Sequence, residues 1–305
     1  MPIAFLFAGQ GSQSVGMGKD LASSCRDCSA LFERADDVLE FPLRRAMWEG
    51  SADDLRHTAV LQPALLALEV AQARHLRAVG RSADWLAGHS VGQYSALVVA
   101  DSLPFEDALH LVRERGLLMQ EAVPDGVGAM AAVLGLERAE IRRLCRTANG
   151  VVGIASHNAP GNTVISGDRA AVAEASASCR EAGATVVELT VSAPFHTALL
   201  EPMVPPFTAL VDKASFRDPR VPVIDNVGAR PLTDAASVRR SLVLQVSAPV
   251  LFEESLRFLV ERGADEFVQC GPGRNVLDYV RRIHGAARVL PFEEAAAGTP
   301  APHGP

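Results

Sequence analysis

The sequence lacks any uncharged run near the roughly 18 apolar residues that a membrane span requires. It has only five cysteines, and such a low, odd count is typical of a reducing compartment rather than of a disulfide scaffold. The first residues, Met1 to Gln13, have no basic stretch and turn glycine-rich at once, unlike a secretory signal. We therefore expect a cytoplasmic location and no membrane contact.

An excess of positive charge is also missing. Lys and Arg number 29 against 36 Asp and Glu, which leaves a net charge of −7 and argues against nucleic acid as a partner. The chain has 305 residues, of which 48% are hydrophobic. This length and composition fit one large globular domain, or a large domain that carries a smaller one.

A single CxxC, Cys25-Arg-Asp-Cys28, is the only pair of cysteines at metal-ligand spacing. No second pair follows it, and no pair of histidines stands at ligand spacing. The motif lies inside residues 21–39, which the apolar pattern predicts to be one amphipathic helix. We expect packed cysteines here and no metal site.

Helix and strand patterns alternate along most of the chain, which predicts an α/β fold. Residues 126–192 differ, because their order β-α-β-β-α-β is that of a ferredoxin-like unit. We expect a large hydrolase-like α/β subdomain with a short parallel sheet, formed by residues 1–125 and 193–292. The ferredoxin-like small subdomain is inserted at 126–192, and residues 293–305 form a flexible tail. Helices are expected at 199–214 and 250–261, a strand at 221–226, and a hairpin turn at 158–161.

Gly88-His-Ser90-Val-Gly92 fits G-x-S-x-G, with an apolar strand before it and a helical pattern after it. In this strand-turn-helix context the serine is thrust out on a sharp bend beside a helix N-terminus, so Ser90 is the candidate nucleophile. Its base is expected to be His196, which follows the last strand of the insert. His89 should point away from Ser90, and His157 in the expected hairpin turn is a weaker candidate.

The group that orients the base is left open by these patterns. Asp168 and Glu188 both lie between Ser90 and His196, but neither has a compelling context. A backbone or side-chain carbonyl would also serve, since the imidazole needs only an acceptor for its N–H.

Eight segments together resemble the malonyl-CoA:acyl carrier protein transacylases, a group that includes fatty-acid enzymes and polyketide acyltransferases. In chain order they are Phe7-Ala-Gly-Gln-Gly-Ser-Gln13, Gln62-Pro-Ala-Leu-Leu66, Gly88-His-Ser-Val-Gly92, Arg115-Gly-Leu-Leu-Met-Gln120, Gly126-Val-Gly-Ala-Met-Ala131, Asn158-Ala-Pro-Gly161, Pro194-Phe-His196 and Gly271-Pro-Gly273. The resemblance implies that Ser90 forms an acyl-enzyme with His196 as base. It also implies that the chain loads an acyl carrier protein from an acyl-CoA thioester, as a monomer, without a cofactor or metal.

The resemblance assigns further roles residue by residue. The carbonyl of Gln245 would orient His196, and the amides of Gln10 and Val91 would form the oxyanion hole. Arg115 would hold the carboxylate of a malonyl group, although without the resemblance it looks like a solvated helix arginine. Three further residues match pocket positions, and the last of them is typical of enzymes that select malonyl: Gln62, Asn158 and Phe195.

Several alternatives stay open at this stage. They are a trans-acting polyketide acyltransferase for another extender unit, an editing thioesterase, the malonyl-transfer subunit of a malonate decarboxylase, and a non-catalytic docking module. A carrier protein is typically acidic, so its docking would need a local basic patch. The available arginines are Arg180, Arg239, Arg240, Arg281 and Arg282.

Overall fold

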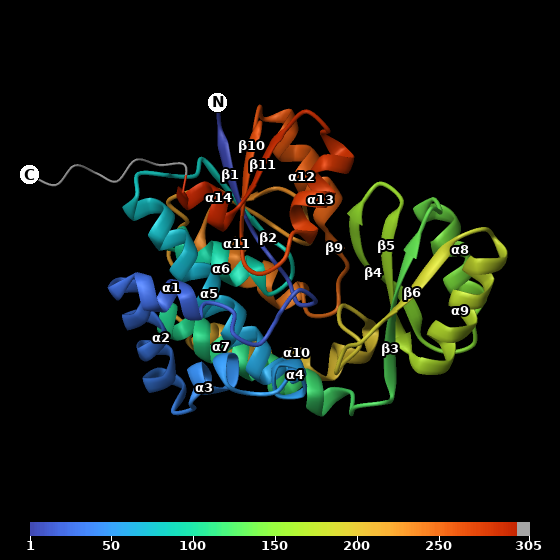
Figure 1. Cartoon of the computed structure of the whole chain (residues 1–305). Coiled ribbons are helices and arrows are strands. Elements are labelled where there is room, and N and C mark those ends of the chain that lie inside the picture. Colours follow the sequence, from blue (N-terminus) through green and yellow to red (C-terminus); the bar gives the residue numbers. More distant parts are fainter. Residues whose placement is uncertain (298–305) are drawn as a thin grey trace, which may run out of the picture.

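Two β-sheets organise the computed structural model, which describes residues 1–297 (Figure 1). The larger sheet has the strand order β11-β10-β1-β2-β7-β8, and its neighbours run parallel except for β7 with β8. Its strands are β1 (Ile3–Phe7), β2 (Trp85–Gly88), β7 (Val223–Ile224), β8 (Pro231–Leu232), β10 (Glu266–Cys270) and β11 (Arg288–Pro291). Parallel neighbours require helical crossovers, which cover both faces of such a sheet.

Strand β1 is apolar throughout because it is buried on both faces. Phe5 and Phe7 join the main hydrophobic core, whereas Ala4 and Leu6 join a second core on the opposite face. The helices of this larger body are α1 (Lys19–Ser24), α2 (Arg26–Leu39), α3 (Leu43–Trp48), α4 (Ala52–Arg56), α5 (Thr58–Ala78), α6 (Gly92–Val99), α7 (Phe105–Ala122), the 3₁₀ helix η1 (Ala198–Met203), α10 (Val204–Lys213), α11 (Ala235–Leu244), α12 (Phe252–Glu261), α13 (Asn275–Ile283) and α14 (Phe292–Ala297). No helix within residues 1–297 is long and apolar enough to cross a bilayer.

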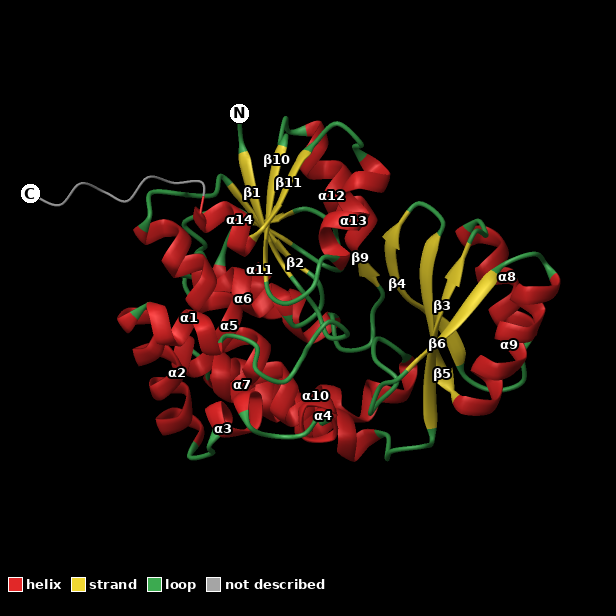
Figure 2. Cartoon of the chain, in the orientation of Figure 1, coloured by secondary structure: helices red, strands yellow, loops and turns green. Residues whose placement is uncertain are grey.

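The smaller sheet has the order β6-β3-β5-β4-β9. Its elements are β3 (Gly128–Leu134), α8 (Arg138–Thr147), β4 (Val152–Ala159), β5 (Asn162–Asp168), α9 (Arg169–Glu181), β6 (Thr185–Leu189) and β9 (Val250–Leu251). The first four strands in chain order form an antiparallel ferredoxin-like unit, with α8 and α9 on the side away from the larger body (Figure 2). The predicted fold class is therefore confirmed.

Strand β9 was not predicted. Residues 250–261 read as one helix, but Val250 and Leu251 pair in parallel with Ser156 and His157 of β4. The helix begins only at Phe252. A strand of two residues is too short to show a periodic pattern, and a tertiary contact decides its conformation.

Other boundaries also differ from expectation. The helix predicted over 21–39 breaks at Cys25, whose extended backbone (φ −130°) separates α1 from α2. The helix predicted over 199–214 is a 3₁₀ turn followed by α10, and the strand predicted over 221–226 pairs only through Val223 and Ile224.

Two further expectations were wrong. His157 and Asn158 lie within β4, so the hairpin turn is confined to Pro160 and Gly161. Residues 293–297 belong to α14, where Phe292 and Ala295 are buried, and are not part of a tail. The rest of the predicted tail, 298–305, lies outside the described residues.

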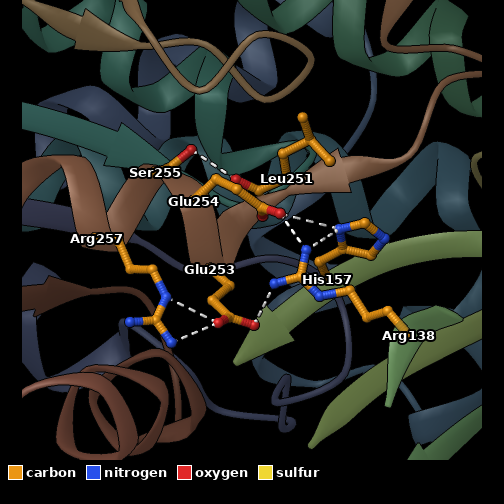
Figure 3. Close-up of polar contacts among 7 residues, drawn as sticks. All are labelled: Arg138, His157, Leu251, Glu253, Glu254, Ser255 and Arg257. Carbon is orange, nitrogen blue, oxygen red and sulfur yellow. Dashed lines mark hydrogen bonds and ion pairs between the residues drawn. The ribbon is translucent and has the colours of Figure 1, made fainter. Parts of the chain in front are cut away.

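An ion cluster joins the two subdomains (Figure 3). Arg138, the first residue of α8, bonds to Glu253 at 2.7 Å and also pairs with Glu254, both on α12. Arg257 holds the other oxygen of Glu253 at 2.8 Å. Burial alone would raise the pKa of Glu254, but contacts with His157 and Arg138 outweigh it and lower that pKa to about 2. The cluster therefore favours charged carboxylates at the junction.

Replacing Arg138 with methionine is expected to lower the free energy of unfolding by about 1–3 kcal/mol, because the nearly buried carboxylate of Glu253 loses a partner. The depressed pKa of Glu254 stabilises the fold fully above its ordinary value of 4.5, and this contribution disappears as the pH falls toward 2. The difference between wild type and Arg138→Met should therefore shrink over that range in urea denaturation.

The matched control is Arg143→Met on the same helix, which breaks an exposed pair with Glu140 and should change little. Equal destabilisation by both variants would show that the α8–α12 cluster has no special role.

Candidate active site

Ser90 sits on a strained turn between β2 and α6. Its backbone has φ 54°, in the left-handed region that non-glycine residues seldom adopt. A Cβ added at Gly92 would lie 2.5 Å from the carbonyl oxygen of Phe7, and one at Gly88 would lie 2.0 Å from the backbone of Gly92. Both glycines of the motif are therefore required for α6 to pack against β1 and β2.

A histidine lies within hydrogen-bond distance of this serine. His196 Nε2 is 2.8 Å from Ser90 Oγ, and His196 Nδ1 is 2.9 Å from the backbone carbonyl oxygen of Gln245. A carbonyl can only accept, so Nδ1 carries the ring proton and Nε2 is free to take the serine proton. The arrangement suits a serine nucleophile activated by a neutral imidazole.

Neither acidic candidate occupies the third position. Asp168 accepts the amide of Val151 at 2.7 Å within the small subdomain, and Glu188 lies on β6. The acceptor for the imidazole is a main-chain carbonyl at the C-terminal end of α11, and this carbonyl comes from Gln245.

His196 is held in an environment that keeps it neutral. Burial and the nearby charge of Arg115 together lower its pKa to about 3. Between about pH 3 and the ordinary histidine value of 6.5, the unfolded chain binds more protons at this residue than the folded chain does. The free energy of unfolding is therefore unaffected by this titration above pH 6.5, and it decreases as the pH falls from 6.5 toward 3.

The rate of acyl-enzyme formation should accordingly stay flat from neutral pH down to about pH 5, because the base stays unprotonated there. The measurement is single-turnover acylation, followed by intact mass across that range. The variant Arg115→Met removes one cause of the lowered pKa of His196. The acidic limb of its pH–rate profile should therefore lie at higher pH than that of the wild type. An acidic limb near 6.5 in the wild-type profile would contradict the assigned environment.

Arg115 comes from α7 and is 1% exposed, so the reading as a solvated helix arginine was wrong. Its guanidinium donates to Gln62 Oε1 at 2.8 Å, to Gln245 Oε1 at 3.1 Å and to Ser90 Oγ at 3.3 Å. Within residues 1–297 no carboxylate pairs with it, and its Nε has no partner. A buried charge without a counter-ion is costly, so the site suits an anionic group bound beside the serine.

Asn226, at the end of the β7 segment, was missed by the sequence reasoning. Its Oδ1 accepts the amide of Ser90 at 2.8 Å, and its Nδ2 donates to the carbonyl of Gly88 at 2.7 Å. The side chain thus bonds to backbone groups on either side of His89 and stabilises the turn. A polar residue at the carboxyl end of a parallel strand is a common place for a functional group, and this position could have revealed it.

The two predicted oxyanion donors lie in the loop after β1 and immediately before α6. Gln10 follows β1 in a loop anchored by the Ala8 amide, which donates to the carbonyl of Cys270 at 3.1 Å. Val91 directly precedes α6. In the described part of the chain neither amide donates to a protein group, so both could serve a developing oxyanion.

A cavity of about 630 Å³ opens above Ser90 and His196 between the subdomains. The larger body contributes Gln10 and Tyr279 to its lining, and β4 contributes Asn158. Phe195 also lines the cavity, and its amide points to Met130 Sδ at 3.3 Å.

Two of the predicted residues support the cavity rather than contact Ser90. Asn158 Oδ1 is 2.9 Å from His89 Nε2, so His89 is turned toward β4 and away from the nucleophile, as expected. Gln62 is fully buried, and its side-chain oxygen accepts a hydrogen bond from Arg115. The structure therefore brings Ser90, His196, Gln245, Arg115 and Gln62 into one network.

Comparison with known proteins adds independent information. A family model described as an acyl transferase domain matches residues 4–285. The chain is 41% identical over 292 residues to a malonyl CoA-acyl carrier protein transacylase of Bacillus subtilis, covering 94% of this chain and 92% of that one. It is 40% identical over 298 residues to the transacylase of the same name from Escherichia coli, covering 96% of both.

Solved structures agree with these relatives. The malonyl CoA-acyl carrier protein transacylase of Coxiella burnetii superimposes with a TM-score of 0.95 at 36% identity, over 98% of this chain and 96% of that one. A malonyl-transacylase in complex with a type II polyketide synthase acyl-carrier protein has a TM-score of 0.92 at 37% identity, over 95% of both chains.

Proposed function

The chain belongs to the acyl transferase domain family, and we propose that it moves a malonyl group from coenzyme A to the phosphopantetheine thiol of an acyl carrier protein. The named relatives at about 40% identity support this substrate pair. The five cysteines are free thiols, which fits a cytoplasmic location. The reaction needs no cofactor, because a thioester is already activated toward nucleophiles.

The first half-reaction forms an acyl-enzyme. Ser90 Oγ attacks the thioester carbonyl while His196 Nε2 takes the hydroxyl proton. The oxyanion that develops is stabilised by the amides of Gln10 and Val91. As the intermediate collapses, the carbon–sulfur bond breaks and His196 returns the proton to the departing coenzyme A thiolate.

The second half-reaction reverses this order with a different thiol. His196 takes the proton of the carrier thiol, whose sulfur attacks the ester carbonyl on Ser90. The carbon–oxygen bond breaks, and the proton returns to Ser90 Oγ. Because coenzyme A leaves before the carrier enters, the kinetics should be ping-pong.

The observation that carries the malonyl assignment is the buried guanidinium of Arg115 beside Ser90, which has no carboxylate partner within residues 1–297. A malonyl carboxylate would supply the missing counter-charge through two parallel hydrogen bonds. An acetyl or simple fatty acyl group would leave that charge uncompensated. An editing thioesterase has no need of such a cation, so the same observation weighs against that alternative.

The test is incubation of the enzyme with malonyl-CoA or acetyl-CoA at equal concentration, followed by intact mass and peptide mapping. We expect one malonyl group on Ser90, little acetylation, and transfer of the malonyl group when holo carrier protein is added. Equal labelling by both acyl groups would overturn the carboxylate assignment. Rapid loss of the label to water without a carrier would favour the thioesterase.

We propose that the carrier protein docks beside one pair of arginines. Arg281 and Arg282 lie on α13, the helix that also lines the cavity through Tyr279. The double variant Arg281→Glu/Arg282→Glu should lower kcat/KM for the carrier by roughly 10-fold and leave acylation by malonyl-CoA unchanged. Arg180→Glu on α9 is the control, because that helix covers the outer face of the small sheet. Steady-state loading that is unchanged in the double variant would remove this surface from consideration.

A further inference from the structure

The fold brings a third side chain capable of binding a metal close to the CxxC motif, and the sequence patterns gave no sign of it. Cys25, Cys28 and His75 each offer a ligand atom, and these atoms all lie within 4.8 Å of one another. Among residues 1–297 they form the one group of three or more His, Cys, Asp or Glu side chains at metal-binding distance. His75 lies on α5, far along the chain from the two cysteines, so no local spacing could have indicated it.

Local structure directs both sulfurs toward α5. Cys25 is the residue where the predicted helix breaks, and its Sγ accepts the amide of Cys28 at 3.3 Å. Cys28 Sγ lies 3.8 Å from the carbonyl oxygen of Ala71, which precedes His75 by one turn on the same face of α5. The His75 ring packs edge-on against Phe292 at 5.8 Å, which restricts its orientation.

Two thiolates and one imidazole are a donor set typical of zinc sites, and they favour Zn²⁺ over Mg²⁺, Ca²⁺ or Mn²⁺. Zinc–sulfur bonds of about 2.3 Å and zinc–nitrogen bonds of about 2.0–2.1 Å place tetrahedral ligand atoms roughly 3.5–3.8 Å apart. The three atoms therefore need to close by only about 1 Å around the ion, and water can take the fourth position. We propose that Cys25, Cys28 and His75 bind Zn²⁺ and clamp the α1–α2 junction to α5.

Binding at this site is coupled to proton release. A thiol binds a metal ion as its thiolate, so zinc displaces protons from the two cysteines, and its affinity should fall as the pH is lowered.

The site is remote from the reaction. The C-terminal half of α5 carries His75, whereas Gln62 near its other end contacts Arg115. Thirteen residues of helix separate them by about 20 Å. Zinc at this site should stabilise the fold without entering the transfer of the acyl group.

The experiment uses the full chain without an affinity tag, reduced and freed of metal by a chelator. Titration with Co²⁺ should give the near-ultraviolet charge-transfer absorption of thiolate ligands at one equivalent, and Zn²⁺ should remove it. Zinc should also raise the midpoint of thermal unfolding by several degrees. Cys25→Ser and His75→Gln should each weaken Co²⁺ binding roughly 10²-fold or more, while circular dichroism and malonylation remain as in the wild type.

The matched control is Cys145→Ser, a buried cysteine of the small subdomain that should leave the cobalt spectrum unchanged. Absence of the thiolate absorption in the reduced wild-type chain would overturn the proposal. So would a spectrum that persists in Cys25→Ser, or an air-stable Cys25–Cys28 disulfide that forms in the presence of excess zinc. None of these outcomes depends on acyl transfer, so they leave the proposed function standing.

Discussion

Ser90→Ala is expected to lower malonyl loading of a carrier protein by about 10⁴–10⁶-fold and to abolish the covalent adduct. The substitution removes the only atom that can carry the acyl group between the two thiols. His196→Ala should cost a comparable factor, and the double variant should be little worse, because Ser90 and His196 act as one unit at 2.8 Å. Initial rates of loading and intact mass give both readings.

The matched control is Ser23→Ala, an exposed serine on α1 whose hydroxyl bonds only within its own helix. It should load the carrier at the wild-type rate. A malonyl adduct on Ser90→Ala, or losses that multiply in the double variant, would contradict a shared role for the two residues.

Arg115→Met should lower kcat/KM for malonyl-CoA by about 10²–10³-fold, because the carboxylate then enters a buried site without its cation. The value of kcat/KM for acetyl-CoA should fall far less, so the variant should largely lose the preference for malonyl over acetyl. Arg115→Lys keeps the charge but not the two-pronged geometry, and it should recover only part of the selectivity. Competition between the two thioesters, read by intact mass, measures the ratio directly.

Arg113→Met provides the comparison on the same helix, where the guanidinium lies over the ring of Phe41 and not beneath Ser90. It should leave the preference intact. Equal losses for both acyl groups in Arg115→Met would show that Arg115 only supports the turn and does not select the substrate.

Much of the fold was predictable because its evidence is local. The apolar run of β1, the glycines around Ser90 and the alternation through residues 126–192 each show in a short stretch of sequence. Residues 105–122 likewise carry a helical pattern, with charges gathered on one face, and the structure has α7 over those residues. Local patterns also led to Ser90 and His196, because a strained turn and a loop after a strand are recognisable.

The remaining features depend on contacts between distant segments. The burial of Arg115 follows from helix packing, and its sequence neighbourhood resembles that of an exposed arginine. Asn226 becomes functional only because β7 pairs beside β2. Strand β9 and the approach of His75 to the two cysteines likewise arise from tertiary structure, which a single sequence does not display.

The pairing of β9 with β4 bears on how the small subdomain can be exchanged between relatives. A chimaera cut at residues 126 and 192 would separate β4 from Val250 and Leu251, and Arg138 from its carboxylates on α12. The donor β4 would then pair with the recipient's β9, and the donor Arg138 would face recipient residues on α12 that need not offer it a matching carboxylate. A graft that also transfers residues 250–254 would keep both the β4–β9 pairing and the ion pairs of Arg138. The unit that can be exchanged between relatives therefore consists of two separate segments of the chain.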